Sequence, residues 1–271
     1  MKYCILCGTK LVTKAKFCSN CGERCQFNNS NKNKEVETQI DLGEIFKKYA
    51  FYFYNLGLNI TCISDQKNEY NSKADNLYLK APNHTWEHLS GERQPLEEFN
   101  SYPWETSTGF GVATGLNNLI TIDFDNCSPE FLVQVLESLS LPYDYEWVVL
   151  SGGRKGFHIY IFVDDVLVNF AKETVVRLFP KPEYKQQIEK VELLIRLHSI
   201  LPPSLHPTKN KYEFINCEKP IKRPARIEFS ILENFIQSFF DVSKQKNLLK
   251  YKRKNKVLKL LQRIEKKYLK I

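Results

Sequence analysis

The spacing of apolar residues changes from segment to segment along the chain. Ile45, Phe46, Tyr49 and Phe53 recur at helical spacing, which predicts a helix over residues 40–56. Short apolar runs bounded by turn residues predict strands instead. The strands are expected at 58–64, 109–114, 119–125, 146–151, 157–163 and 190–197, and further helices at 128–140, 168–179 and 228–241. Because strands and helices interleave, the pattern predicts a mixed α/β or α+β core.

The two ends of the chain differ in charge from its middle. The net charge is +8, but residues 1–34 hold +6 and residues 244–271 hold +11, which leaves −9 for residues 35–243. Acidic groups gathered near a metal site would make the middle negative, and basic ends favour the phosphates of a nucleic acid. A solvated helix face is the alternative for the C-terminal charge. The stripe that predicts a helix there is Val257, Leu260, Leu261, Ile264 and Tyr268.

Five of the eight cysteines lie in the first 25 residues. Two Cys-x2-Cys pairs are separated by ten residues, and a glycine follows each pair. Paired thiolates at this spacing can hold one tetrahedral zinc ion, so a structural Zn²⁺ is expected on Cys4, Cys7, Cys18 and Cys21, with Cys25 as a substitute ligand. A disulfide pair is the alternative, which a cytosolic location disfavours. Cys62, Cys127 and Cys217 are expected to be ordinary small apolar residues.

The expected organisation is a zinc ribbon at 1–25, an Asn-rich linker at 26–39, a catalytic domain at 40–227 and a basic helical segment at 228–271. No apolar run approaches the roughly 20 residues that span a bilayer, and the start lacks the apolar stretch of a signal peptide. A cytoplasmic protein is therefore expected. No G-x4-G-K-[ST] motif occurs, so a nucleotide-driven helicase motor is not expected in this chain.

The candidate chemistry begins with Asp123 and Asp125, which end the apolar run that starts at Leu119. Residues two apart on a strand point to the same face, so the two carboxylates should project side by side. Neighbouring like charges are unfavourable unless a positive group lies between them, and a hard divalent cation is the usual one. A strand that runs into an Asp-rich turn is the alternative.

A glycine-rich segment, Ser151 to Gly156, leads into the next predicted strand and its His158. Glycines allow close approach of the backbone, and successive N–H groups can bind an anion. Arg154 and Lys155 add positive charge at the same point. The alternative is a glycine-rich hairpin with a structural histidine.

Glu192 is a lone carboxylate in an otherwise apolar strand. A buried carboxylate needs a partner, either Arg196 or a metal ion. The stiff Pro202-Pro203 turn that follows is expected to hold Ser204 and His206 in position.

Together these segments resemble the amino-terminal domain of bifunctional DNA primase/polymerases, in the archaeo-eukaryotic primase superfamily. The resemblance covers roughly residues 50–215 and rests on four elements: a strand ending in Asp-x-Asp, a Ser-Gly-Gly stretch leading to a histidine, an acid upstream of Pro-Pro-Ser, and a Lys-x-Pro…Trp element. The Asp-x-Asp strand is Ile122–Asp125, preceded by Gly109–Gly115, and the Ser-Gly-Gly stretch is Ser151–Gly153, which leads to His158. The acid upstream of Pro202–Ser204 is Glu192, and the Lys-x-Pro…Trp element is Lys80–Pro82 with Trp86. The superfamily often has Ser-x-His where this chain has Gly156-Phe157-His158, so a hydroxyl at 156 is missing. Glu189 is the alternative third acid, although Glu192 is better placed within the apolar strand.

The resemblance implies a primase-type α+β core with an RRM-like sheet, plus the ribbon and the basic helix. It implies a primase or DNA polymerase that joins NTPs or dNTPs to a 3′-hydroxyl on a single-stranded DNA template. The implied catalytic residues are Asp123, Asp125, Glu192 and His158, and the three acids are implied to hold two Mg²⁺ or Mn²⁺ ions. The implied contacts to the nucleotide are Arg154, Lys155, His158, Ser204, His206 and Lys80. The ribbon and basic helix are expected to contact template or the initiating nucleotide, and a helicase or other replication protein is a further candidate partner.

Two other functions stay open from the residues alone. One is a non-catalytic module that binds single-stranded nucleic acid during replication. The other is a metal-dependent nuclease, because carboxylate clusters also hydrolyse phosphodiesters. The glycine-rich segment with its two cations favours triphosphate binding over hydrolysis.

Overall fold

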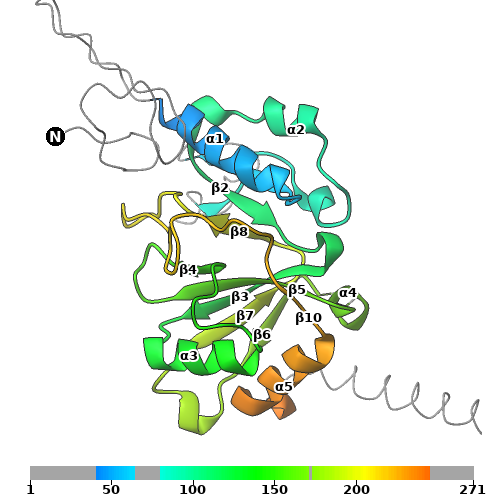
Figure 1. The fold of residues 1–271 in the computed structure, drawn as a ribbon, viewed down its shortest axis with the longest axis vertical. Helices are drawn as coiled ribbons and strands as arrows, with labels where there is room; N and C mark the ends of the chain where they lie inside the picture. The colour runs from blue at the N-terminus through cyan, green and yellow to red at the C-terminus, as the bar shows by residue number, and fades with distance from the viewer. Residues whose placement is uncertain (1–40, 65–79, 171–172, 245–271) are drawn as a thin grey trace, which may run out of the picture. The chain divides into compact units, whose positions relative to one another are not determined.

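The computed structural model describes residues 41–64, 80–170 and 173–244. The predicted zinc ribbon, the linker and residues 245–271 of the basic C-terminal segment lie outside the described residues, so each of them stays a prediction. Within the described part, two sheets are stacked, with helices on their outer faces (Figure 1). This arrangement confirms the α+β class, while the finer primase-type core and RRM-like sheet stay predictions.

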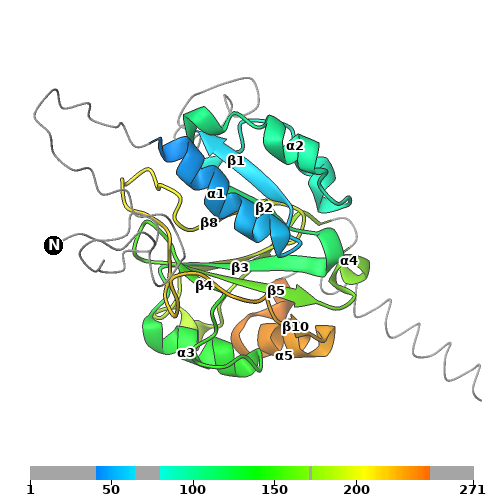
Figure 2. The same cartoon turned by 45° about the horizontal axis from the view of Figure 1, so that its top comes forward.

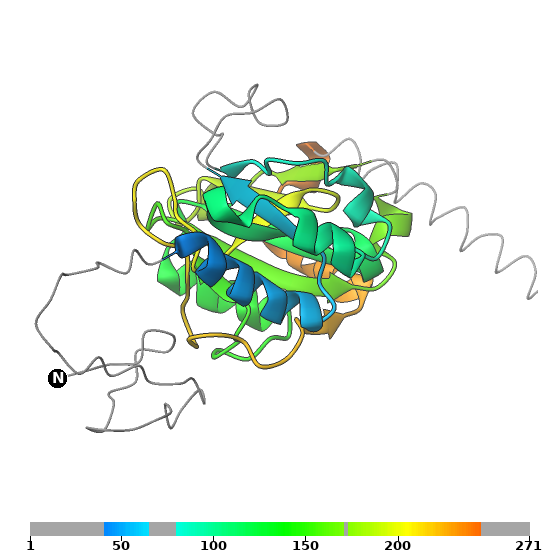
Figure 3. The same cartoon turned by 90° about the horizontal axis from the view of Figure 1, so that it is seen from above.

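The smaller layer is a three-stranded antiparallel sheet covered by a helix. Its order is β1-β2-β8, with β1 at Ile60–Ser64, β2 at Ser107–Ala113 and β8 at His198–Leu201. The covering helix is α1, Leu42–Asn55, and the short α2, Leu96–Ser101, lies beside it (Figure 3). Helix α1 begins where the Asp41 carboxylate accepts hydrogen bonds from two backbone N–H groups of the first turn. Its buried positions, Phe46, Ala50 and Phe53, follow the spacing that predicted it.

The larger layer is a sheet with the order β6-β7-β3-β5-β4-β9, in which β10 pairs with β5. The helices α3 and α5 cover the face that is turned away from the smaller layer (Figures 1 and 2). The strands are β3 Leu119–Asp125, β4 Val148–Leu150, β5 Phe157–Val163, β6 Val175–Leu178, β7 Lys190–Leu194, β9 Glu213–Phe214 and β10 Arg226–Ile227. The helices are α3 Pro129–Ser138, α4 Val166–Asn169 and α5 Phe229–Phe239, with 3-10 turns at Glu87–Ser90, Trp104–Thr106, Leu116–Asn118, Pro182–Tyr184 and Val242–Lys244.

Alternating side chains of the larger sheet face the two different layers. Phe124 on β3 contacts Phe235 of α5, with ring centroids 6.5 Å apart. Tyr160 on β5 points the other way, because its hydroxyl donates to the Ile200 carbonyl at 2.6 Å and accepts from Ser199 Oγ at 2.9 Å, both on β8. The residues of β3 that alternate with Phe124, which include Asp123, therefore face the smaller sheet.

Most predicted elements are confirmed, and one helix prediction is wrong. The strands at 119–125 and 157–163 have the predicted ends. The helix predicted at 168–179 is not present: α4 ends at Asn169, and Val175–Leu178 is the strand β6, which pairs with β7. Val176 and Leu178 are buried while Arg177 between them is exposed, which is the period of a strand with two β-branched residues at its start. The segment predicted as one strand at 190–197 is instead β7 and a turn leading into β8.

In the described part of the chain, no helix is long and apolar enough to cross a bilayer. Cys62 and Cys127 are buried free thiols and Cys217 is half-buried, in agreement with the interpretation of all three as small apolar residues.

Candidate active site

Strand β3 carries Asp123 in the interior of the larger sheet. The antiparallel register places Asp123 directly opposite His158 on β5 and opposite Glu192 on β7. Directly opposite residues share a face of the sheet, so three strands contribute one row of polar side chains. Within this row, His158 Nε2 lies 3.4 Å from Asp123 Oδ1. Asp125 lies two residues further along β3, on the same face and at the end of the strand.

Two cations neutralise the acids of this row. Lys190 lies opposite Asp125 in the register, and its Nζ is 2.9 Å from Glu192 Oε2 and 3.6 Å from Asp125 Oδ2. Arg177 on β6 lies opposite Glu192 and donates to Glu192 Oε1 from Nε at 3.1 Å and from Nη2 at 2.9 Å. Arg196, the predicted protein partner of Glu192, instead donates to the carbonyls of Phe170 and Glu173.

The environment shifts the pKa values of the two inner acids in opposite directions. Desolvation raises the pKa of Asp123; His158 opposes this rise, while Asp125 and Glu192 add to it. Burial also acts to raise the pKa of Glu192, but the hydrogen bonds from Lys190 and Arg177 outweigh it and lower that pKa below its usual value. Asp123 is therefore the acid of the row that would gain most from an added positive charge.

The donor chemistry of the row fits a hard divalent cation, since carboxylate oxygens are the ligands that Mg²⁺ and Mn²⁺ prefer. In the conformation described, however, no group of three or more His, Cys, Asp or Glu side chains among the described residues is gathered closely enough to hold a metal ion. The ammonium of Lys190 bridges Asp125 and Glu192. A metal ion that used both carboxylates would have to displace it.

The glycine-rich segment 151–156 lies beside the histidine end of the row. A Cβ at Gly152 would come within 2.2 Å of His206 Cβ, so this glycine is needed for the close approach of the two loops. The side chains of Thr208 and Asn210 donate to the Gly152 carbonyl at 2.9 and 3.0 Å. These contacts tie the loop after β8 to the glycine-rich segment.

Three basic side chains gather at this point. Tyr212 lies between two histidines, with its ring centroid 5.7 Å from that of His158 and 5.6 Å from that of His206. Desolvation lowers the pKa of His206 to about 4, and the electrostatic effects of Lys80 and His158 add to the lowering. An anion bound beside His206 would oppose these effects and favour its protonated form.

The sequence profile of bifunctional DNA primase/polymerase, N-terminal (Prim-Pol), matches residues 68–226. That range holds the row of Glu192, Asp123 and His158 with Asp125 beside it, called the acid row below, as well as the glycine-rich segment and His206. The chain belongs to the Prim-Pol family. Membership indicates a DNA primase/polymerase of the nucleotidyltransferase type, with DNA and nucleotides as substrates, in a family that generally uses divalent metals. No curated protein matches the chain significantly.

Two of the predicted phosphate ligands of the Prim-Pol domain are exposed on the same turn. Arg154 has a left-handed backbone, with φ at +61°, and makes a bidentate ion pair with Glu213 of β9, with both N–O distances 2.7 Å. Arg154 would have to leave Glu213 before it could bind a phosphate. Lys155 is also exposed, and its carbonyl accepts from the N–H of Cys127.

Ser204 is buried, and its hydroxyl is engaged by the backbone of β2. Its Oγ accepts from the Phe110 N–H at 2.8 Å and donates to the Phe110 carbonyl at 2.9 Å. A Cβ at Gly109 would lie 2.3 Å from Ser204 Cβ, so the smallness of Gly109 makes this contact possible. Ser204 thus joins the Pro-Pro turn to the smaller sheet.

Gly156 has no room for the serine that the superfamily often carries at this position. A Cβ there would lie 2.3 Å from the backbone carbonyl oxygen of Phe124. The glycine allows β5 to start close to the end of β3, next to Asp123. The missing hydroxyl is therefore a consequence of close backbone packing in this chain.

Sequence reasoning missed three residues of the site: Lys190, Arg177 and Tyr212. Lys190 had a usable signal, because it lies two residues before Glu192 on a predicted strand and so shares its face. Arg177 was hidden by the wrong helix prediction, and nothing in the sequence pattern singled out Tyr212. Of the two candidate third acids, Glu192 lies in the row, whereas Glu189 precedes β7 and pairs with Asn126.

Proposed function

We propose that this Prim-Pol domain is a template-directed nucleotidyltransferase that joins NTPs or dNTPs to a 3′-hydroxyl on a single-stranded DNA template. The observation that carries the proposal is the row formed by Glu192, Asp123 and His158 in register across three strands. Under this proposal the acidic end of the row would serve metal ions and the histidine end would serve a triphosphate, side by side on one sheet. Positioning and charge stabilisation dominate phosphoryl transfer, so this arrangement suits it.

The acids Asp123, Asp125 and Glu192 are the residues that would hold Mg²⁺ or Mn²⁺. When bound, such ions stabilise the charge that develops on the transferred phosphoryl group and on the pyrophosphate that leaves. Lys190 and Arg177 lower the pKa of Glu192 and so favour its ionised form until then. Since each already contacts a carboxylate, both are near enough to pair with a phosphate after release.

His158, His206 and Lys80 are the residues that would bind the triphosphate, together with the N–H groups of the glycine-rich segment. The contact between His158 and Asp123 orients the imidazole, so that the nucleotide end and the acidic end of the row keep a constant spacing. Arg154 and Lys155 lie on the same turn and would add charge at its outer edge. Ser204 would act by holding the turn that carries His206.

The ends of the chain would supply template binding. We propose the division into a ribbon at 1–25, a linker at 26–39, the catalytic domain at 40–227 and a basic segment at 228–271, with Zn²⁺ on Cys4, Cys7, Cys18 and Cys21. The +6 and +11 charges of the two ends favour single-strand phosphates. Deleting 244–271 is expected to weaken binding and to reduce the salt dependence by about 0.7 for each phosphate that the segment would have neutralised.

The test is incorporation of labelled nucleotides on a single-stranded template, with and without a primer, comparing NTPs with dNTPs in Mg²⁺ or Mn²⁺. Asp123→Asn and Asp125→Asn should abolish incorporation but keep the thermal unfolding transition. Extension by both variants at the wild-type rate would refute the assignment of the acids. Binding of single strands without incorporation by the wild type would favour the non-catalytic module, and strand cleavage would favour the nuclease.

A further inference from the structure

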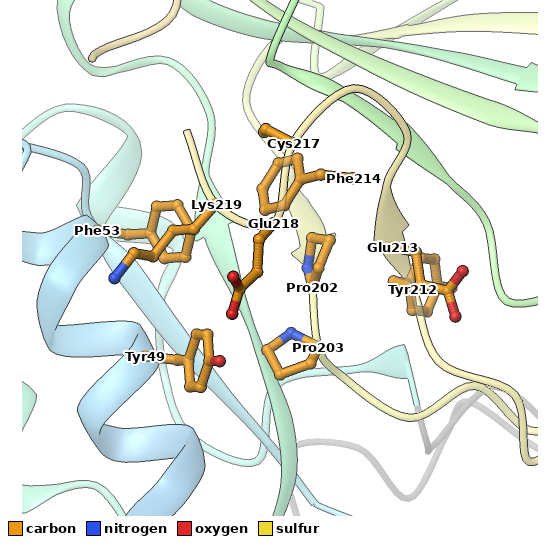
Figure 4. A pocket seen from close by; sticks show the side chains of 10 residues that line it. All are labelled: Tyr49, Phe53, Pro202, Pro203, Tyr212, Glu213, Phe214, Cys217, Glu218 and Lys219. Atoms are coloured by element: carbon orange, nitrogen blue, oxygen red, sulfur yellow. The ribbon is translucent and has the colours of Figure 1, made fainter. Parts of the chain in front are cut away.

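A pocket of about 330 Å³ lies next to the histidine end of the acid row, with Tyr212 as the residue that the two share. Its walls come from α1, from the turn after β8 and from the segment around β9 (Figure 4). The lining is mainly rings: Tyr49, Phe53, Pro202, Pro203, Tyr212 and Phe214. Three charged residues complete the lining: Glu213 and Lys219 at the rim, and Glu218, whose carboxylate points inward (Figure 4).

Contacts between the walls of the pocket fix its shape. The Tyr52 hydroxyl of α1 donates to the Pro220 carbonyl at 2.8 Å, and Lys219 Nζ lies 3.9 Å from the centre of the Tyr52 ring. Phe53 and Phe214 pack together with centroids 6.0 Å apart. Helix α1 and the segment after β9 are thus fastened to each other, and the space between them is a preformed feature of the fold.

Two residues connect the pocket with the proposed nucleotide site. Tyr212 forms one wall, and the same ring lies 5.7 Å from the His158 ring. Glu213 stands at the rim and makes the bidentate pair with Arg154 on the glycine-rich turn. A ligand in the pocket would therefore lie one aromatic ring away from a bound nucleotide.

We propose that this pocket binds one unpaired base of the single-stranded nucleic acid that the site copies, an inference that rests on the proposed function. The half-buried ring of Tyr49 can stack on any base, and a base is the part of a single strand that has both a flat apolar face and a polar edge. Lys219 at the rim, and Lys211 next to Tyr212, would neutralise the adjoining phosphates. An apolar peptide side chain would use the rings but would leave these charges without a role.

Glu218 gives the pocket a preference among the bases. Figure 4 shows its carboxylate pointing into the space between Tyr49 and the two prolines. An ionised carboxylate only accepts hydrogen bonds, so it favours a base edge that carries donors. Guanine offers two donors side by side, cytosine and adenine offer an amino group, and thymine offers a single N–H between two carbonyls. The expected order of affinity is guanine first and thymine last.

The test is binding of fluorescent 15-mers by the full chain in the absence of divalent metal and nucleotide. Oligo-dT carrying one central dG should bind about fivefold more tightly than plain oligo-dT. Glu218→Gln should remove most of this difference while keeping the affinity for oligo-dT. Tyr49→Leu should weaken binding of both by about fivefold, and Tyr49→Phe should restore it, because only the ring is needed. Glu130→Gln on α3, which removes an exposed charge on the other side of the larger sheet, is the matched control.

The outcomes separate this inference from the proposed enzyme. If single strands bind and are extended but Glu218→Gln and Tyr49→Leu change nothing, the pocket has another occupant and this inference alone is overturned. If no single strand binds the wild type, both proposals fail. If the base preference depends on Glu218 but nothing is incorporated, the pocket is supported and the enzymatic proposal falls.

Discussion

Lys190 is expected to limit the affinity of the acid row for metal ions, because its ammonium lies where a cation would bind. Its Nζ is 2.9 Å from Glu192 Oε2 and 3.6 Å from Asp125 Oδ2. At about 4 Å, two unit charges near a protein surface attract each other by about 4 kcal/mol before solvation and entropy are considered. The net value of such pairs is far smaller, about 1 kcal/mol, because water and side-chain freedom compensate. That net value corresponds to a change of about fivefold in a dissociation constant.

The perturbation is Lys190→Ala, and the assay is titration with Mn²⁺ followed by electron paramagnetic resonance, without nucleotide and at fixed ionic strength. The variant is expected to bind Mn²⁺ about fivefold more tightly than the wild type. Lys185→Ala is the matched control, since it removes an equal charge from an exposed position five residues away. It should change the affinity much less if contact, and not net charge, is the cause.

Two results would refute this reasoning. If Lys190→Ala bound Mn²⁺ with wild-type affinity, the ammonium would not compete with the metal. If the variant bound Mn²⁺ more weakly, Lys190 would be helping to arrange the carboxylates. Because Mn²⁺ binding is measured without nucleotide incorporation, the assay tests the metal affinity of the carboxylates whether or not the protein is a polymerase.

Three further predictions concern buried polar contacts and close packing in the described fold. Ser204→Ala should lower the free energy of unfolding by about 2 kcal/mol in a urea titration, because a backbone N–H and carbonyl of β2 lose their buried partner; an unchanged stability would contradict this. Gly156→Ser would introduce the hydroxyl that the superfamily often carries, but it should lower both the free energy of unfolding and the rate of incorporation, since its Cβ would lie 2.3 Å from the Phe124 carbonyl oxygen. A variant as active and as stable as the wild type would show that the backbone can move. His84 has a pKa lowered from 6.5 to about 4 by burial, and its Nε2 accepts from the Cys62 N–H at 2.9 Å. The pKa of His84 is lower in the folded protein than in the unfolded chain. Its contribution to the free energy of unfolding is therefore complete above about pH 6.5 and is lost toward pH 4, by up to about 3 kcal/mol. His84→Gln should reduce the difference in the free energy of unfolding between pH 7 and pH 5, measured by urea titration, and a difference equal to that of the wild type would exclude this histidine as the cause.

Residue pattern alone identified the parts of the site that lie close together in the chain. The Asp123–Asp125 spacing and the glycine-rich segment before His158 are local features, and the face on which a strand residue lies follows from its period of two. The same reasoning failed at 168–179, where two valines and an alternating pattern form the edge strand β6. Because of that error, Arg177 was not predicted as a site residue: it lies opposite Glu192 only when β6 pairs with β7.

The order of residues along the chain fixes which side chains are available, including the acids, the histidines and the matches to the Prim-Pol family. Folding in three dimensions makes some of them neighbours, because strand order is set by long-range pairing that leaves no local signal. It put β3 between β5 and β7, and so set Asp123 between His158 and Glu192. It also assigned the Ser204 hydroxyl to the backbone of β2, and it enclosed a ring-lined pocket between α1 and the segment around β9. Packing in three dimensions decides these points, since each depends on residues that are distant in the chain and close in space.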